Sequence, residues 1–119
     1  MALAVNRPLN IIRVHCHIAD SGTAGSAFTV APCRGKIVLL GQVPHVAPTG
    51  AANVLTAKIA ATSITIPTWQ QAVAAAGTVS EVAPTAANFC NAGDNIEFIT
   101  DGAGSTTTPT TFYADILVS

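Results

Sequence analysis

Hydrophobic and polar positions alternate with a period of two in several short runs of this chain. The clearest run covers residues 9–19, where apolar side chains occupy the even positions from 12 to 18 and His15 and His17 occupy odd positions. Successive side chains of a strand point to opposite faces, so we expect the even positions to face a core. The odd positions, Arg13 among them, are expected to face solvent or a partner.

Other runs follow the same pattern and are separated by Gly, Pro and Asp residues typical of turns. Residues 36–43 are apolar on both sides of the pleat, which predicts a strand covered on both faces. Residues 69–76 fit either a short helical turn or a strand of small residues, and residues 101–109 predict an exposed loop. The predicted strands cover residues 9–19, 26–30, 36–43, 53–60, 62–66, 78–82, 95–100 and 110–118.

Short strands with frequent turns indicate an all-β fold. We expect a single-domain, jelly-roll-like β-sandwich of about eight antiparallel strands over residues 9–119. Residues 1–8 have no clear pattern and include Pro8. They predict either an N-terminal arm that becomes ordered against a neighbouring molecule or a frayed terminus.

The composition favours a protein that contacts other proteins. The chain has 119 residues, of which half are hydrophobic and only 9% are charged, against about 25% in typical globular domains. Contact patches between proteins are depleted in charged residues at their centres. The alternative is a small soluble protein with a neutral surface, and we favour burial in an oligomer or a larger particle.

Charge and hydropathy exclude several classes of function. The net charge is −1 and the five Lys and Arg residues form no basic stripe, which argues against nucleic-acid binding. No apolar run approaches the roughly 20 residues of a membrane-spanning helix. The N-terminus does not resemble a signal peptide, so we expect folding in a reducing cytoplasm.

Few residues suggest catalysis, a metal or a cofactor, and we predict none of these. On a strand, His15 and His17 share one face while Cys16 points the other way, so the three cannot bind one metal ion together. The three cysteines match no zinc or redox motif and are expected to be reduced core thiols. No nucleophile elbow is present.

The acidic and aromatic residues suggest few sites. A calcium site made of Asp94 and Asp101 is a weaker alternative to two hairpin turns. Trp69 fits core packing, an interface or a platform for a sugar.

Two segments carry short motifs. Residues 28–38 (FTVAPCRGKIV) fit the pattern "apolar-Pro-x-x-Gly-x-Ile/Val", and residues 86–102 contain "Ala-Gly-Asp-x-Ile". These motifs are similar to the opening strand and to a later turn and strand of the capsid decoration (cement) proteins of tailed bacteriophages. The resemblance implies a jelly-roll-like virion protein without catalytic residues on the outside of an icosahedral capsid. Its partners are then the major capsid protein and further copies of itself, for which we expect a trimer.

We expect the subunit or shell contacts to include five residues with side chains suited to an interface, namely Arg13, His15, His17, Trp69 and Tyr113. Three alternatives remain open. The first is a receptor- or carbohydrate-binding β-sandwich of a phage fibre, the second a small hydrolase, and the third a tail-tube or minor capsid component.

Overall fold

A computed structural model describes residues 10–119, and these residues form strands and loops without a helix. The predicted arm over residues 1–8 lies outside the described residues. The strands are β1 (Ile11–Ile18), β2 (Gly25–Val30), β3 (Gly35–Pro44), β4 (Asn53–Ile59), β5 (Thr62–Ser63), β6 (Gln70–Gln71), β7 (Ser80–Val82), β8 (Phe89–Cys90), β9 (Asn95–Thr100) and β10 (Thr110–Val118).

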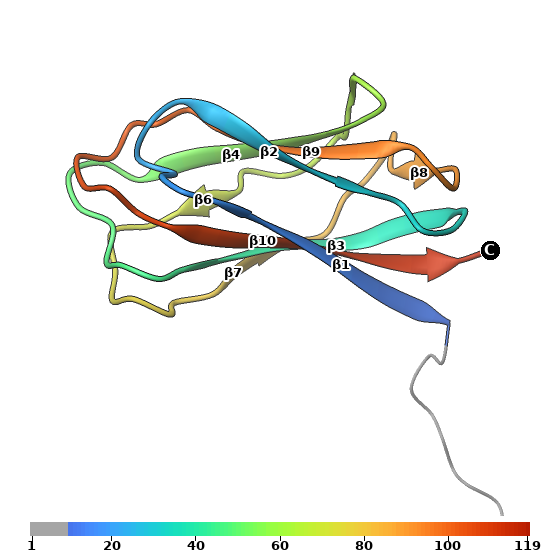
Figure 1. The fold of residues 1–119 in the computed structure, drawn as a ribbon, viewed down its shortest axis with the longest axis horizontal. Coiled ribbons are helices and arrows are strands. Elements are labelled where there is room, and N and C mark those ends of the chain that lie inside the picture. The colour runs from blue at the N-terminus through green and yellow to red at the C-terminus, as the bar shows by residue number, and fades with distance from the viewer. Residues whose placement is uncertain (1–9) are drawn as a thin grey trace, which may run out of the picture.

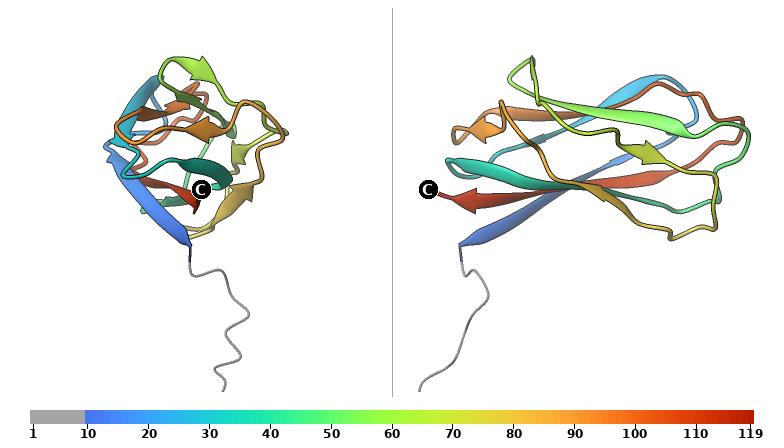
Figure 2. Two further views of the ribbon diagram at one scale, coloured as in Figure 1. Left: turned by 90° about the vertical axis from the view of Figure 1, so that its right-hand side faces the viewer. Right: turned by 180° about the vertical axis from the view of Figure 1, so that it is seen from behind.

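The strands form two antiparallel sheets packed face to face, which confirms the predicted all-β, jelly-roll-like sandwich (Figures 1 and 2). The first sheet has the order β1-β10-β3-β7, and β8 also pairs with β3. The second has the order β2-β9-β4-β5, and β6 also pairs with β4. We refer to them as the β10 sheet and the β9 sheet after their central strands.

The core lies between the two sheets and is centred on three aromatic side chains. The rings of Phe98 in β9 and Phe112 in β10 are stacked with centroids 5.2 Å apart. Trp69 packs edge-on against Phe112 with a centroid distance of 6.1 Å and is 2% exposed. Because aromatic side chains bury large apolar areas, this trio joins the two layers.

Alternation explains how the long strands are placed. In β10, Phe112, Ala114 and Ile116 are fully buried, as the pattern predicts. In β1, residues 14, 16 and 18 pack against the core, but Ile12 is 40% exposed and the core does not cover it. The prediction that all even positions of this strand face the core is therefore wrong at Ile12.

A buried polar network lies between the sheets at the end where residues 101–109 connect β9 to β10. The Gln71 side chain accepts hydrogen bonds from Ser21 Oγ (2.6 Å) and Asn53 Nδ2 (2.8 Å). It donates to Gln42 Oε1 (2.9 Å) and Thr110 Oγ1 (2.8 Å). Asn53 Oδ1 also accepts from the Gly104 amide, so the network fixes the 101–109 loop to the sandwich.

Three further findings bear on the sequence analysis. Residues 69–76 contain the short strand β6 instead of a helical turn. The three cysteines are free, and burial raises the pKa of the Cys16 thiol to about 11. Within residues 10–119 there is no helix long and apolar enough to span a membrane.

Candidate functional site

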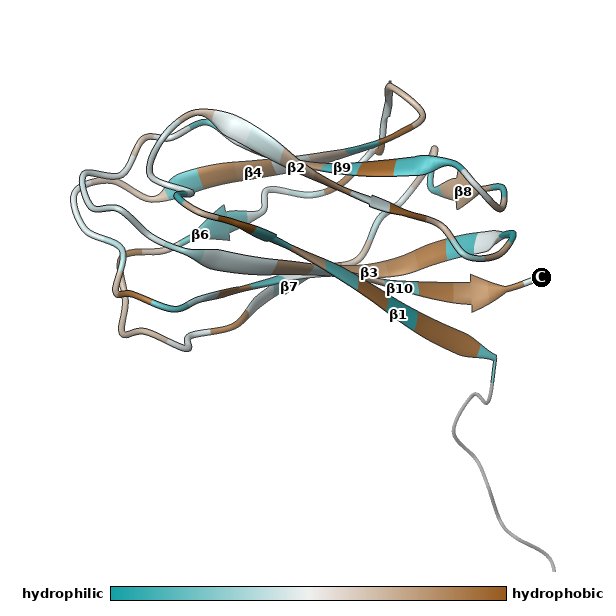
Figure 3. Cartoon of the chain, viewed as in Figure 1, coloured by the Kyte–Doolittle hydropathy of each residue, from teal (hydrophilic) through white to brown (hydrophobic). Residues whose placement is uncertain are grey.

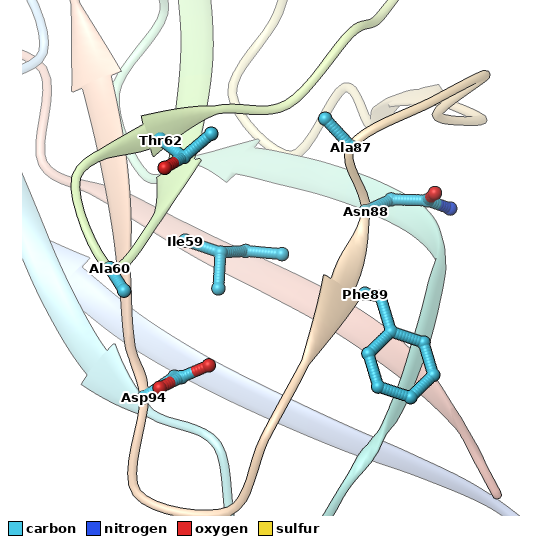
Figure 4. Close-up of a pocket in the computed structure, with 7 residues that line it drawn as sticks. All are labelled: Ile59, Ala60, Thr62, Ala87, Asn88, Phe89 and Asp94. Atoms are coloured by element: carbon cyan, nitrogen blue, oxygen red, sulfur yellow. The ribbon is translucent and has the colours of Figure 1, made fainter.

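An open hollow of about 380 Å³ lies at the end of the sandwich that carries the C-terminus. The β4–β5 turn forms one wall and the segment leading into β8 forms another, while Asp94 closes the third side from the β8–β9 turn (Figure 4). Its volume falls within the range of small-molecule sites, which span roughly 300–1,000 Å³. The lining residues are Ile59, Ala60, Thr62, Ala87, Asn88, Phe89 and Asp94.

The backbone around the hollow is strained. Among residues 10–119, only Ala60, Ala61 and Ala87 combine a side chain with a positive φ, at +46°, +70° and +53°. Ala60 and Ala87 line the hollow and Ala61 is adjacent in the same turn. A left-handed conformation costs an L-residue roughly 1–2 kcal/mol. Such strain gathers at functional sites more often than elsewhere.

Phe89 provides the aromatic wall. Its side chain is 51% exposed, although β8 pairs with β3 through the Lys36–Phe89 and Gly35–Cys90 positions. The Arg34 guanidinium lies over the Phe89 ring at 5.6 Å. Ile59, which is 5% exposed, lies between this ring and the β4–β5 turn. The hollow therefore has an apolar floor and one aromatic side.

Asp94 provides the charge. One of its carboxylate oxygens accepts a hydrogen bond from the Asn91 amide at 2.9 Å, and its carbonyl accepts one from the Ala31 amide. The other carboxylate oxygen has no hydrogen-bond partner within residues 10–119. Thr62 lies on the opposite wall and is exposed. The Asn88 side chain bonds to β3, where its Nδ2 donates to the Ile37 carbonyl at 2.6 Å.

The seven lining residues limit the chemistry that the hollow offers. Glycoside hydrolysis generally requires two carboxyl groups about 5–10 Å apart, and Asp94 is the one carboxylate among the seven lining residues. Serine, cysteine and histidine are likewise absent from that lining. What remains is an aromatic surface beside hydrogen-bonding oxygens.

Four of the five predicted contact residues lie together on the outer face of the β10 sheet. Arg13 pairs with Asp115 and His15 with Tyr113 in the β1–β10 register, and His17 lies opposite Thr111. The register thus brings Arg13, His15, His17 and Tyr113 to one surface.

Polar side chains on that surface form hydrogen bonds and an ion pair with one another. Arg13 donates to both carboxylate oxygens of Asp115, at 2.7 and 3.0 Å, and its guanidinium lies 4.2 Å from the Tyr113 ring centroid. The Tyr113 hydroxyl donates to Glu81. Burial and this hydrogen bond raise the pKa of Tyr113 to about 12. Tyr113 covers Gly41, where any β-carbon would meet its ring.

Trp69 does not join this surface, because it is 2% exposed and belongs to the aromatic core. Of the three interpretations of Trp69, core packing is the one that its position fits, and the expected contact role at Trp69 is wrong for the described chain.

His17 and His45 have ring centroids 5.7 Å apart. Residues 10–119 contain no group of three or more His, Cys, Asp or Glu side chains placed to hold a metal ion.

The weaker calcium hypothesis also fails on position. Asp94 precedes β9 and Asp101 follows it, so six strand residues, or about 20 Å, separate them. Asp101 Oδ1 instead accepts hydrogen bonds from the Val54 and Ala103 amides. The sequence does not indicate the hollow, because Phe89 lies in a two-residue strand and the Ala-Ala turn carries no Gly or Asn.

No family model and no curated protein matches the sequence. Solved structures share the fold at low identity. The catalytic unit of a GH87 α-1,3-glucanase from Streptomyces thermodiastaticus aligns with a TM-score of 0.56 and 10% identity, over 92% of this chain and 26% of that one. The chain thus spans about a quarter of that enzyme unit. An arabinose-bound GH51 α-L-arabinofuranosidase aligns with a TM-score of 0.53 and 12% identity, over 82% of this chain and 18% of that one.

A family 35 carbohydrate-binding module from Clostridium thermocellum aligns with a TM-score of 0.48 and 14% identity, over 94% of this chain and 95% of that one. The two likenesses above 0.5 show that the chain has a β-sandwich fold that also occurs as part of larger chains.

Proposed function

We propose that this chain is a non-catalytic, carbohydrate-binding β-sandwich and that the hollow at Phe89 is its sugar site. The observation that carries the proposal is that the half-exposed Phe89 ring, Asp94 and Thr62 line one hollow of about 380 Å³. Sugars present apolar C–H faces and hydroxyl groups, and this site offers a surface for each.

The chemistry of the two walls suits a neutral saccharide. The C–H face of a pyranose packs on an aromatic ring as apolar surface, with its partly positive hydrogens toward the negative ring face. The free Asp94 oxygen can accept hydroxyl hydrogen bonds, which are stronger to an ionised acceptor than to a neutral one. The size of the hollow suits a short saccharide.

The fold adds support. The GH87 α-1,3-glucanase and the GH51 α-L-arabinofuranosidase that contain a similar sandwich both act on carbohydrates. A sugar-binding role also agrees with the lining of the hollow, which offers hydrogen-bonding oxygens but no second carboxylate. On this proposal the protein holds a saccharide without cleaving it.

The test is a glycan-array screen followed by calorimetric titration of the best saccharide. Phe89→Ala is expected to raise Kd more than about tenfold, because it removes the stacking surface. Asp94→Asn should weaken binding by removing the charge. The side-chain oxygen of the new asparagine still accepts the hydrogen bond from the Asn91 backbone amide. Phe28→Ala is the matched control, since Phe28 is 57% exposed on β2 and does not line the hollow. An equal loss in both phenylalanine variants, or no binding to any glycan, would refute the proposal.

A second candidate function is the one that the phage resemblance implies, decoration of a capsid surface through contacts with the major capsid protein. The favouring observation is the scarcity of charge, with 9% charged residues in the chain, together with nine exposed large apolar side chains among residues 10–119. Sedimentation with expanded, undecorated phage shells separates the candidates. A decoration protein sediments with shells whether or not Phe89 is intact, whereas a sugar-binding module stays in the supernatant. The exposed apolar residues are Ile11, Ile12, Phe28, Val30, Val46, Val54, Val73, Val79 and Phe89.

A further inference from the structure

The two sides of the sandwich end in very different strands. On one side the β10 sheet ends in β1, which has eight residues, and the β9 sheet ends in β2, which has six. On the other side the sheets end in strands of two or three residues, namely β5, β6, β7 and β8. Very short edge strands are one way in which proteins prevent edge-to-edge pairing. The β1 side lacks this protection (Figure 1).

The hydrogen-bond pattern identifies which backbone groups of β1 are open. The Val118 amide donates to the Asn10 carbonyl at 2.8 Å, and this pair continues the register of β1 with β10. In an antiparallel pair every second residue bonds to the partner strand. The even residues of β1 therefore bond to β10, and residues 11, 13, 15 and 17 direct their N–H and C=O groups outward. No strand within residues 10–119 pairs with that edge.

The β1 edge also lacks the other devices that block pairing. It contains no proline, and its register with β10 has no bulge. Its one charged residue, Arg13, is already neutralised by the bidentate pair with Asp115. Ile11 and Ile12 are 37% and 40% exposed at its beginning, and polar and apolar bands alternate along it (Figure 3). The edge therefore offers a row of backbone hydrogen-bonding groups with two exposed isoleucines at its beginning.

We propose that two copies of this chain form a two-fold dimer by pairing their β1 strands antiparallel, with the axis at Val14. In this register each open residue meets an open residue of the other copy, because residue 11 pairs with 17 and residue 13 pairs with 15. A shifted register with residue 13 opposite itself would place two arginines face to face, which is destabilising. The register about Val14 avoids this. The pairing joins two β10 sheets into one continuous sheet.

The symmetry of this register favours a second copy of the chain as the partner of the edge. The register that satisfies all four open residues is symmetric about Val14, so one surface serves both partners, as a two-fold interface requires. The hollow at Phe89 is built from β4, β5 and β8 with their adjoining turns. It lies away from β1 in the sheet order, so the dimer leaves it open and does not depend on the proposed sugar binding.

Sedimentation equilibrium over a range of concentrations tests the dimer. We expect a concentration-dependent species of twice the 12.0 kDa monomer mass. His15→Pro removes an outward-facing N–H at a position where an edge strand tolerates proline, and should shift the protein to monomer. His15→Ala retains the backbone donor and should still dimerise. A wild-type monomer at all concentrations, a trimer, or an equal effect of the two substitutions would overturn the proposal.

A covalent test remains informative even if the proline variant folds poorly. Residue 14 forms a non-hydrogen-bonded pair with itself across the axis, where Cα atoms lie about 4.5 Å apart, within the range that a disulfide spans. Val14→Cys should therefore form a covalent dimer under mild oxidation. Val54→Cys, at an exposed position of the β9 sheet, should not exceed the wild-type background. Equal cross-linking of both variants would contradict the register.

Discussion

One substitution in the β4–β5 turn is expected to stabilise the protein by relieving backbone strain instead of by adding a contact. Ala60 and Ala61 connect β4 to β5 in a two-residue hairpin, with φ values of +46° and +70°. Both central residues of a type I′ turn have positive φ, and Asn-Gly is the favoured pair there. Ala61→Gly should therefore relieve strain.

The size of the effect follows from two opposing terms. A left-handed φ costs an alanine roughly 1–2 kcal/mol. Glycine is free of that cost but gains conformational entropy in the unfolded chain, which lowers stability by about 0.4–1 kcal/mol. The difference favours Ala61→Gly by about 0.5–1 kcal/mol, or a rise in Tm of about 3 °C for a domain of this size.

Urea unfolding and differential scanning calorimetry measure the change directly. The control is Ala103→Gly, because Ala103 is exposed and does not have a positive φ. There only the entropy term acts, so the free energy of unfolding should fall by about 0.4–1 kcal/mol. The two substitutions thus have opposite signs despite identical chemistry. If Ala61→Gly lowered stability as Ala103→Gly does, the assignment of strain to this turn would be refuted.

Three further predictions concern the core and the β10 sheet. Gln71→Leu removes four buried hydrogen bonds and leaves Asn53 Nδ2 and Gln42 Oε1 without a partner among residues 10–119, so the free energy of unfolding, measured in urea, should fall by roughly 3 kcal/mol or more. Phe112→Ala removes the ring that stacks on Phe98 and contacts Trp69, with an expected loss of about 3–5 kcal/mol in the same assay.

The folded-state pKa of Tyr113, about 12, lies above its unfolded value near 10, so this group's stabilisation is complete below about pH 10 and is lost as the pH rises to about 12. In Tyr113→Phe the decline in unfolding free energy over that interval should be smaller than in the wild type.

The sequence predicts β1, β4, β9 and β10 because their alternation extends over six or more residues. β9 and β10 lie where Ile96, Phe98 and Phe112 indicate an inward face. The sequence does not indicate β8 and leaves β6 as one of two alternatives for residues 69–76, since two residues carry no periodicity. Tertiary pairing created both, through β4 and β3. The position of Trp69 in the core depends on the same pairing, so its burial was one of several interpretations of the sequence.

The candidate site could not be predicted for a related reason. Its walls are turns, and the segment IAATSI contains no Gly, Asn or Asp to indicate a left-handed conformation. The contacts that hold Ala60 and Ala87 are supplied by distant segments, such as the bond from the Ala60 amide to the Asn95 carbonyl at 3.0 Å. Local propensity opposes this geometry, and tertiary structure imposes it.

The strained alanines divide into two groups that binding measurements can separate. The methyl groups of Ala60 and Ala87 line the hollow, whereas Ala61 does not. On the proposed function, Ala87→Gly should stabilise the fold as Ala61→Gly does but weaken saccharide binding, because it removes apolar surface and loosens the wall beside Phe89. Ala61→Gly should leave the affinity unchanged. If both substitutions stabilised the protein and neither altered binding, the strain would belong to the fold alone, and the sugar would have to bind on another surface.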